Sequence, residues 1–244
     1  MDNIKKITVT DVCKKFKIGS NMHKGMLAKF VSIFSGREPK KTIEVLKNIS
    51  FDVYSGEIVG IIGNNGSGKS TLLRIIAGIY SKDSGSIVAD GKIVSLISLN
   101  AGLKERLTMR DNIYLCGALF GLSREAINKK FNSIVEFSEL NSFVDTKIYQ
   151  FSEGMKQRIS FSIAIHCNPD ILLLDEVFEV GDEDFREKSV SKMKELVENG
   201  LSIVIVSHDM QMTQKYCNRV LWLDKGVKIK EGSPENIIDE YLNS

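Results

Sequence analysis

The chain has 244 residues, of which 43% are hydrophobic and 26% charged, and a net charge of only +2, so it is long enough to bury a full core in one domain. Its four cysteines are far apart and form no CxxC pair, which argues against a disulfide framework and a zinc site and indicates a reducing compartment. The apolar runs fall short of the roughly 20 residues that span a bilayer, and the first residues carry no signal-peptide pattern, so we expect no membrane-spanning segment.

The N-terminal segment is the basic part of the chain. Residues 1–42 contain ten Lys or Arg and three Asp or Glu, whereas the remaining residues have an acidic excess. Five apolar residues within it fall on one side at helical spacing: Met26, Leu27, Phe30, Val31 and Phe34. The segment 20–42 therefore predicts either a basic amphipathic helix at a membrane surface or a helix packed on its own domain with a solvated basic rim.

Strand-like runs rich in β-branched residues occur at both ends of the chain. The early runs, at 7–12 and 43–53, predict a small antiparallel lobe. The later runs lie at 57–62, 92–99, 171–177, 201–207 and 219–230. Because helical patterns separate these later runs, they predict an α/β sheet with parallel strands.

The helical patterns complete the α/β prediction. They lie at 67–80, 109–122, 123–140, 152–167, 182–200 and 233–243. The last one begins with a Ser233 cap and Pro234 at the first helical position. Residues from about 101 to 150 are mostly helical and interrupt the strand series, so we predict an inserted helical lobe there.

A glycine-rich segment, GNNGSGKST, connects the strand-like run at 57–62 to a helical pattern and matches GxxxxGK[ST]. Its glycines permit a tight loop whose backbone N–H groups form a nest for phosphate at a helix N-terminus. Lys69 would supply positive charge to the β- and γ-phosphates, and Ser70 a hydroxyl to Mg²⁺. A chance glycine-rich turn is the alternative. The residues expected to bind the nucleotide are Gly63, Asn64, Asn65, Gly66, Ser67, Gly68, Lys69, Ser70 and Thr71.

Polar residues end two of the later strand-like runs. After ILLL, Asp175 would orient Mg²⁺, commonly through water, and Glu176 would accept a proton from the attacking water. Without a phosphate loop, such a pair is more often a helix cap. His208 follows the run at 201–207; a histidine there is usually a surface residue, but at this sheet edge it could hydrogen-bond the γ-phosphate. We therefore predict Lys69, Glu176 and His208 as catalytic, and Ser70 and Asp175 as metal ligands.

Together these motifs resemble the ATP-binding cassette (ABC) ATPases. Residues 151–158, FSEGMKQR, are similar to the family's signature sequence and lie just upstream of ILLLDE. The resemblance implies a head-to-tail dimer in which Ser152 and Gly154 of one subunit meet the γ-phosphate held by the other. From the residues alone, Ser152 could also simply cap a helix, and the two roles are compatible.

The resemblance implies roles for two further residues. Phe16, in VCKKFKIG, corresponds to the aromatic residue that stacks on adenine, although a lone Phe after a basic pair could as easily belong to the core. Asp182, in EVGD, falls on the family's dimer-coupling loop.

Within the family, the chain is most similar to exporters of bacterial surface polysaccharides and teichoic acids. The similarity rests on NAGLKERLTMRDNIYL, FSEGM and DEVFEVGDEDFREK, and it covers about residues 43–225. Three positions depart from the family pattern. Leu99 stands where most members carry a glutamine, and polymer exporters share this departure. In the signature sequence, Phe151 replaces a Tyr and Glu153 replaces a small residue. Glu153 would either repel nucleotide or face solvent in the first helical turn, where the helix dipole favours it; we expect the second.

The resemblance implies a fold, a reaction and a set of partners. We expect one α/β nucleotide-binding domain over residues 1–244, with a P-loop NTPase core, a small antiparallel β lobe and an inserted helical lobe that docks on the permease. The expected cofactors are ATP and Mg²⁺. Two copies would sit peripherally, bound to integral membrane permease subunits at the cytoplasmic face of the plasma membrane, and drive export of a lipid-linked polymer.

Some further expectations concern what lies outside this core. We expect no C-terminal carbohydrate-binding domain and no nucleic-acid partner, and the basic segment 20–42 could lie beside the entrance for the negatively charged polymer. The alternative function is a non-transport ABC ATPase acting on a soluble or ribosomal partner. It is disfavoured because such members usually carry two cassettes or a long coiled coil, and this chain shows neither pattern.

Overall fold

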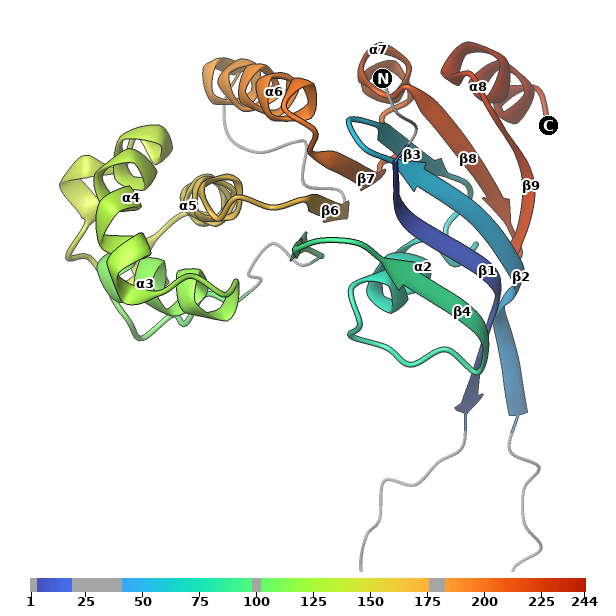
Figure 1. Cartoon of the computed structure of the whole chain (residues 1–244), viewed down its shortest axis with the longest axis horizontal. Helices are drawn as coiled ribbons and strands as arrows, with labels where there is room; N and C mark the ends of the chain where they lie inside the picture. The colour runs from blue at the N-terminus through green and yellow to red at the C-terminus, as the bar shows by residue number, and fades with distance from the viewer. Residues whose placement is uncertain (1–3, 19–40, 98–101, 176–182) are drawn as a thin grey trace, which may run out of the picture.

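The computed structural model describes residues 4–18, 41–97, 102–175 and 183–244, and it contains two β-sheets (Figure 1). The smaller sheet has the order β2-β1-β4, and both neighbours run antiparallel to β1. Its strands are β1 (Lys5–Ile18), β2 (Lys41–Tyr54) and β4 (Ser84–Ala89). The sequence predicted shorter early strands and missed β4, because this edge strand is largely exposed and lacks an apolar run.

The larger sheet has the order β5-β6-β7-β3-β8-β9, and all of its neighbouring pairs are parallel except β8 and β9. Its strands are β3 (Ile58–Ile62), β5 (Ile93–Leu96), β6 (Ile171–Asp175), β7 (Ser202–Val206), β8 (Arg219–Asp224) and β9 (Val227–Gly232). The run at 219–230 is thus a hairpin rather than one strand. Its turn places Lys225 and Gly226 at φ 45° and 81°, as a type I′ turn requires.

The helices fall into three groups. Helix α2 (Lys69–Ile76) follows β3, and α3 (Met109–Leu119), α4 (Arg124–Ser138) and α5 (Glu153–His166) form a helical lobe together with two 3₁₀ turns, η1 (Asn141–Phe143) and η2 (Ile148–Gln150). The last group is α6 (Glu183–Glu198), α7 (Met210–Tyr216) and α8 (Pro234–Leu242). The sequence missed α7, which is short.

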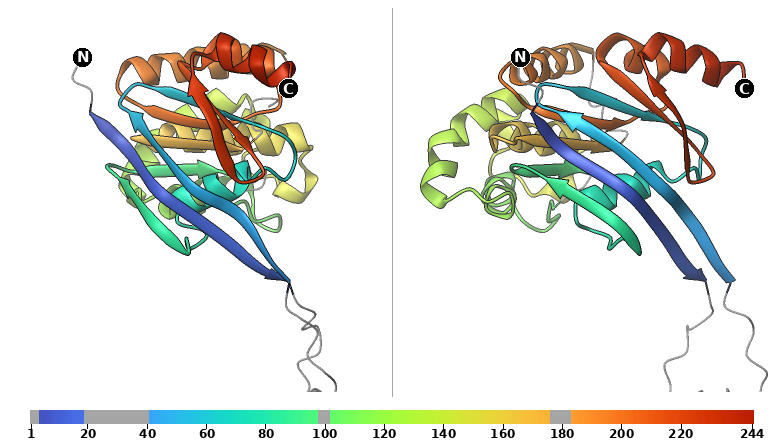
Figure 2. Two further views of the ribbon diagram at one scale, coloured as in Figure 1. Left: turned by 90° about the vertical axis from the view of Figure 1, so that its right-hand side faces the viewer. Right: turned by 45° about the vertical axis from the view of Figure 1, so that its right-hand side comes forward.

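Alternate residues of the central strand β3 point into two hydrophobic clusters. Val59 and Ile61 pack with α2 and the antiparallel sheet, so α2 lies between the two sheets (Figures 1 and 2). Ile58 and Ile62 belong to the cluster that includes buried residues of α6, α7 and α8, which cover the opposite face. With both faces covered, β3 reads as a continuous apolar run, as the sequence suggested.

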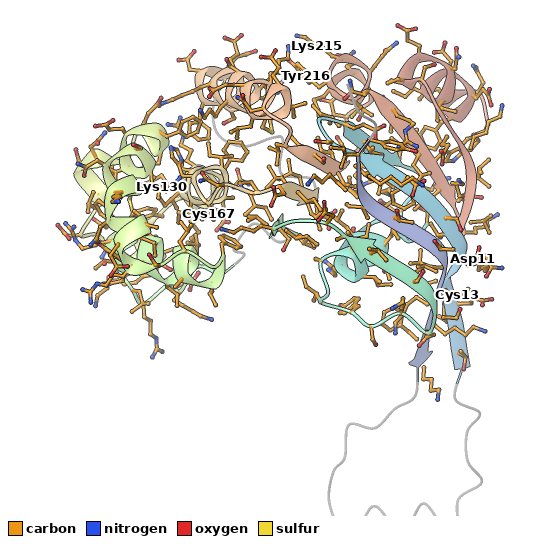
Figure 3. All side chains as sticks on the ribbon, viewed as in Figure 1. Asp11, Cys13, Lys130, Cys167, Lys215 and Tyr216 are labelled. Atoms are coloured by element: carbon orange, nitrogen blue, oxygen red, sulfur yellow. The ribbon has the colours of Figure 1, made fainter. Side chains whose placement is uncertain are left out.

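The cysteines do not form disulfides, as the sequence predicted. Figure 3 shows Cys13 on the antiparallel sheet and Cys167 beside α5, on different parts of the molecule. Burial raises the pKa of the Cys167 thiol to about 11 and that of Cys217 to about 12. These buried thiols therefore remain protonated and act as small hydrophobic side chains.

The architecture confirms the predicted fold class: a parallel sheet with a strand–loop–helix phosphate motif, a small antiparallel lobe and an inserted helical lobe. Across the described ranges of the chain, every helix is too short or too polar to cross a bilayer.

Candidate nucleotide-binding site

The register of the large sheet brings several of the predicted site residues to one edge. Ile61 of β3 pairs with Val206 of β7, and Val206 pairs with Asp175 of β6. Because these strands are parallel, the loop after β3, the end of β6 and the residues after β7 all lie at their carboxyl ends. This is where open α/β sheets bind ligands.

The phosphate loop begins with a tight turn. The backbone N–H of Ser67 donates to the carbonyl oxygen of Asn64 at 3.1 Å, and Gly66 has a φ of 80°, as in a type II turn. Gly63 has a φ of 145°, and a Cβ there would collide with the carbonyl oxygen of Leu223. Glycine is therefore required at the position where the chain leaves β3.

Residues of the phosphate loop differ in exposure. Asn64, Asn65 and Gly66 are exposed at the tip, whereas Gly63, Ser67, Gly68 and Lys69 are buried, and Ser70 and Thr71 are half-buried. The Oγ of Ser67 is buried without a hydrogen-bond partner within the described structure.

Lys69 is held over the loop. Its side-chain Nζ donates to the carbonyl oxygens of Gly63 at 2.7 Å and Asn64 at 3.1 Å, and the residue is only 5% exposed. An ammonium group in this position is poorly hydrated, so the loop offers a preplaced positive charge to an anion such as phosphate.

Two side-chain oxygen atoms that could coordinate a metal ion lie close together at the start of α2. The hydroxyl of Ser70 donates to Asp175 Oδ1 at 3.1 Å, although the two residues are 105 positions apart in the sequence. This donor set fits Mg²⁺, which is usually bound by one or two protein oxygens together with substrate phosphates and water. Among the described residues no cluster of three or more His, Cys, Asp or Glu could hold a metal, so a metal site made of protein ligands alone is not found there.

Phe16 lies in β1 with its ring half-buried. The ring of Tyr80, which follows α2, meets it edge-on with centroids 5.7 Å apart, and Lys14 Nζ lies 5.1 Å from the Phe16 centroid. Arg74 in turn lies 5.9 Å from the Tyr80 ring. The sequence did not single out Tyr80, since its proximity to Phe16 depends on how α2 packs beside the antiparallel sheet. The role of Phe16 in adenine stacking stays a prediction.

The signature segment lies on the helical lobe (Figure 1). Ser152 caps α5, since its Oγ accepts from the Met155 N–H at 3.2 Å, and Gly154 lies in the first turn. Glu153 is exposed in the same turn and pairs with Lys156 at 2.9 Å, which also contacts Glu105. The Glu153 carboxylate thus faces solvent and has a basic partner.

The remaining predicted residues are placed only in part. His208 follows β7 at the edge that carries the phosphate loop, and its side chain is exposed. Glu176, Asp182 and Leu99 lie outside the described residues, as does most of the segment 20–42. The catalytic roles of Glu176 and His208 therefore stay predictions.

Residues 46–179, more than half of the chain, match the family described as ABC transporter. The chain belongs to the ABC transporter family. The match spans the phosphate loop, the signature segment and Asp175, whereas Phe16 and His208 lie outside it.

Several curated relatives of this ABC protein are named as parts of export systems. The chain is 41% identical, over 97% of its own length, to the teichoic acids export ATP-binding protein TagH of Lactococcus lactis, of which it covers 50%. It is 39% identical to the O-antigen export system ATP-binding protein RfbB of Klebsiella pneumoniae, a match that covers 83% of this chain and 86% of that protein. The chain spans about half the length of the first curated relatives it matches.

Solved structures of ABC proteins share the fold. A dimeric ATP-binding cassette in a post-hydrolysis state, bound to ADP and Pi, superposes with a TM-score of 0.76 at 26% identity. The match covers 93% of this chain and 98% of that one.

Proposed function

We propose that the chain is the ATP-hydrolysing subunit of an ABC exporter that moves a lipid-linked surface polysaccharide or teichoic acid across the cytoplasmic membrane. The observation that carries this proposal is the similarity to the O-antigen export protein, which extends over most of both chains. The contact between Ser70 and Asp175 beside the phosphate loop supports the nucleotide chemistry.

The residues of the proposed site have different roles in ATP hydrolysis. The backbone N–H groups of the loop and Lys69 bind the phosphates, and Ser70 and Asp175 hold Mg²⁺, which supplies charge neutralisation when bound. Glu176 accepts the proton of the attacking water, and His208 hydrogen-bonds the γ-phosphate. Phe16 stacks on the adenine.

A second copy of the chain completes the site. The exposed N-terminus of α5, with Ser152 and Gly154, contacts the γ-phosphate bound by the partner subunit, where helix N–H groups favour an anion. The dimeric solved cassette bound to ADP and Pi supports this arrangement. ATP binding then closes the dimer, and hydrolysis reopens it.

The helical lobe meets the membrane subunits of the exporter. A groove of about 400 Å³ is lined by residues of α2, β5 and α3, and one of them, Leu119, is 65% exposed. Its other lining residues are Arg74, Ile79, Ser95, Ile97, Gly102, Cys116 and Phe120. An exposed, largely apolar groove is suited to receive a helix of a permease. The chain therefore works peripherally at the cytoplasmic face of the plasma membrane.

The test is co-purification from membranes. The tagged chain is expressed in its own organism, membranes are solubilised in mild detergent with ATP present, and co-purifying proteins are identified. Recovery of a polytopic membrane protein, and loss of polymer export on deletion of the gene, support the proposal. Recovery of ribosomes or only soluble proteins would favour a non-transport ATPase instead.

A further inference from the structure

The C-terminal helix α8 contacts the phosphate loop directly. The hydroxyl of Tyr241, near the end of α8, donates to the side-chain Oδ1 of Asn64 at 3.1 Å, although the two residues are 177 positions apart. The motif that identifies the loop says nothing about Tyr241, so neither sequence pattern nor spacing predicts the contact. It joins the last helix of the chain to the tip of the predicted phosphate site.

Packing against β8 and the hydrophobic core holds Tyr241 in place. Its ring packs edge-on against Trp222 of β8, with centroids 5.6 Å apart. Helix α8 is anchored by Ile237 and Ile238, each only 3% exposed, which belong to the main hydrophobic cluster. The hydroxyl therefore approaches Asn64 from a fixed position rather than from a freely moving surface side chain.

Asn64 accepts two of the hydrogen bonds that shape the phosphate loop. Its backbone carbonyl oxygen accepts both the Ser67 N–H, which closes the turn, and the ammonium group of Lys69, each at 3.1 Å. A hydrogen bond to the Asn64 side chain thus fixes the residue that closes the turn and helps to orient the lysine.

The neighbouring hairpin attaches to the same loop through backbone groups. The Gly226 N–H, in the turn between β8 and β9, donates to the carbonyl oxygen of Ser67 at 3.0 Å, and the Leu223 carbonyl packs against Gly63. Side-chain substitution leaves these backbone contacts in place. The Tyr241 hydroxyl can instead be removed by itself, while the ring and its packing on Trp222 are kept.

We propose that Tyr241 is a positioning residue for nucleotide binding: through Asn64 it holds the phosphate loop in the shape that receives the phosphates. The inference rests on the proposed ATP site and adds to it a residue from outside the family's motifs. Because the hydrogen bond restrains Asn64 and does not itself involve the ligand, its effect is preorganisation, which improves affinity without a new contact to the ligand.

The decisive variant is Tyr241→Phe, and Tyr114→Phe is its matched control. The Tyr114 hydroxyl also donates to an asparagine Oδ1, that of Asn128, but on the helical lobe, where it links α3 to α4. Affinity for the imido analogue of ATP, AMP-PNP, with Mg²⁺ is measured by titration calorimetry on the full chain. We expect Tyr241→Phe to weaken binding about two- to tenfold, the range for one hydrogen bond, and Tyr114→Phe to leave it unchanged.

A double-mutant cycle with Asn64→Ala separates positioning from general packing. In the Asn64→Ala background, removal of the Tyr241 hydroxyl should no longer change the affinity, because its acceptor is gone. Equal affinity of Tyr241→Phe and wild type would overturn the inference but leave the proposed function intact. An undiminished effect of Tyr241→Phe in the Asn64→Ala background would also overturn it. Absence of AMP-PNP binding by the wild type would overturn both.

Discussion

At the residue scale, Gly63 combines two constraints in one position. Its φ of 145° is rarely adopted by L-residues, and a Cβ would collide with the Leu223 carbonyl, which belongs to the neighbouring strand β8. Both the conformation and the close approach of two backbones demand glycine where β3 ends and the phosphate loop starts.

The Gly63→Ala variant should therefore lose stability and nucleotide binding together. The matched control is Gly121→Ala, since Gly121 also has a positive φ, 78°, but a Cβ there meets nothing within 4 Å. We expect Gly121→Ala to cost about 1–2 kcal/mol of unfolding free energy from backbone strain. Gly63→Ala should cost about 1–3 kcal/mol more because of the collision. Urea unfolding measures the difference, and equal losses would contradict the crowding seen around Gly63.

Asp175 provides the charge of the proposed metal site. The Asp175→Asn variant keeps an oxygen that can accept from the Ser70 hydroxyl but loses the negative charge. We expect the gain in nucleotide affinity that Mg²⁺ provides to fall by about 10- to 100-fold, whereas affinity measured in EDTA changes little. Asp90→Asn, which removes the same charge at an exposed ion pair with Lys6, is the control. An unchanged Mg²⁺ dependence would remove Asp175 from the site.

The sequence was sufficient to recognise the glycine-rich loop between β3 and α2 but not the surroundings of that loop. The loop is encoded in nine consecutive residues, so its pattern is visible without a structure. The pairing of Ser70 with Asp175 could be anticipated, because the loop after β3 and the end of β6 lie at the same carboxyl edge of a parallel sheet. The contacts of Asn64 with Tyr241 and of Phe16 with Tyr80 could not, since they depend on how distant elements pack.

At the element scale, whether a strand could be recognised from the sequence depended on how deeply that strand is buried. Strands covered on both faces, such as β3 and β7, are continuous apolar runs and are easily recognised. Strand β4 is mostly exposed, and its sequence SGSIVA carries little apolar signal. The β8–β9 hairpin was read as one strand because its turn, Lys225-Gly226, lacks the Asn or Asp that usually marks a type I′ turn.

Helix α5 shows how one residue can serve an element and a site. Ser152 caps it by accepting from the Met155 N–H, and Ser123 caps α4 in the same manner by accepting from the Ala126 N–H, both at 3.2 Å. Replacement of either serine by alanine should cost about 1 kcal/mol of unfolding free energy.

The two caps should differ in function. We expect Ser152→Ala to weaken nucleotide-dependent dimerisation as well, because the proposed γ-phosphate contact comes from this helix end, whereas Ser123→Ala should affect stability alone. Chemical denaturation and sedimentation of the two variants with Mg²⁺ and ATP provide the comparison. Equal dimerisation of both variants would indicate that Ser152 acts only as a helix cap.

At the scale of the whole molecule, the parts of the proposed site are divided between two surfaces. The phosphate loop and Asp175 lie at the edge of the large sheet, whereas Ser152 and Gly154 lie on the helical lobe, which the chain builds from a separate segment (Figure 1). A second copy in head-to-tail orientation would bring the two surfaces together around one nucleotide. Catalysis would then require the dimer, and hydrolysis would be the step that releases it.

The Glu176→Gln variant tests this arrangement. If Glu176 accepts the proton from the attacking water, a glutamine cannot replace it, because an amide oxygen is not basic enough to take the proton. The other residues of the nucleotide site are unchanged in this variant. We expect turnover to be abolished and the ATP-bound dimer to accumulate, since the step that reopens it no longer occurs. Size-exclusion chromatography with and without ATP should show the shift from monomer to dimer, and Lys69→Ala in the same background should abolish it. Hydrolysis by Glu176→Gln at the wild-type rate would show that Glu176 is not the general base.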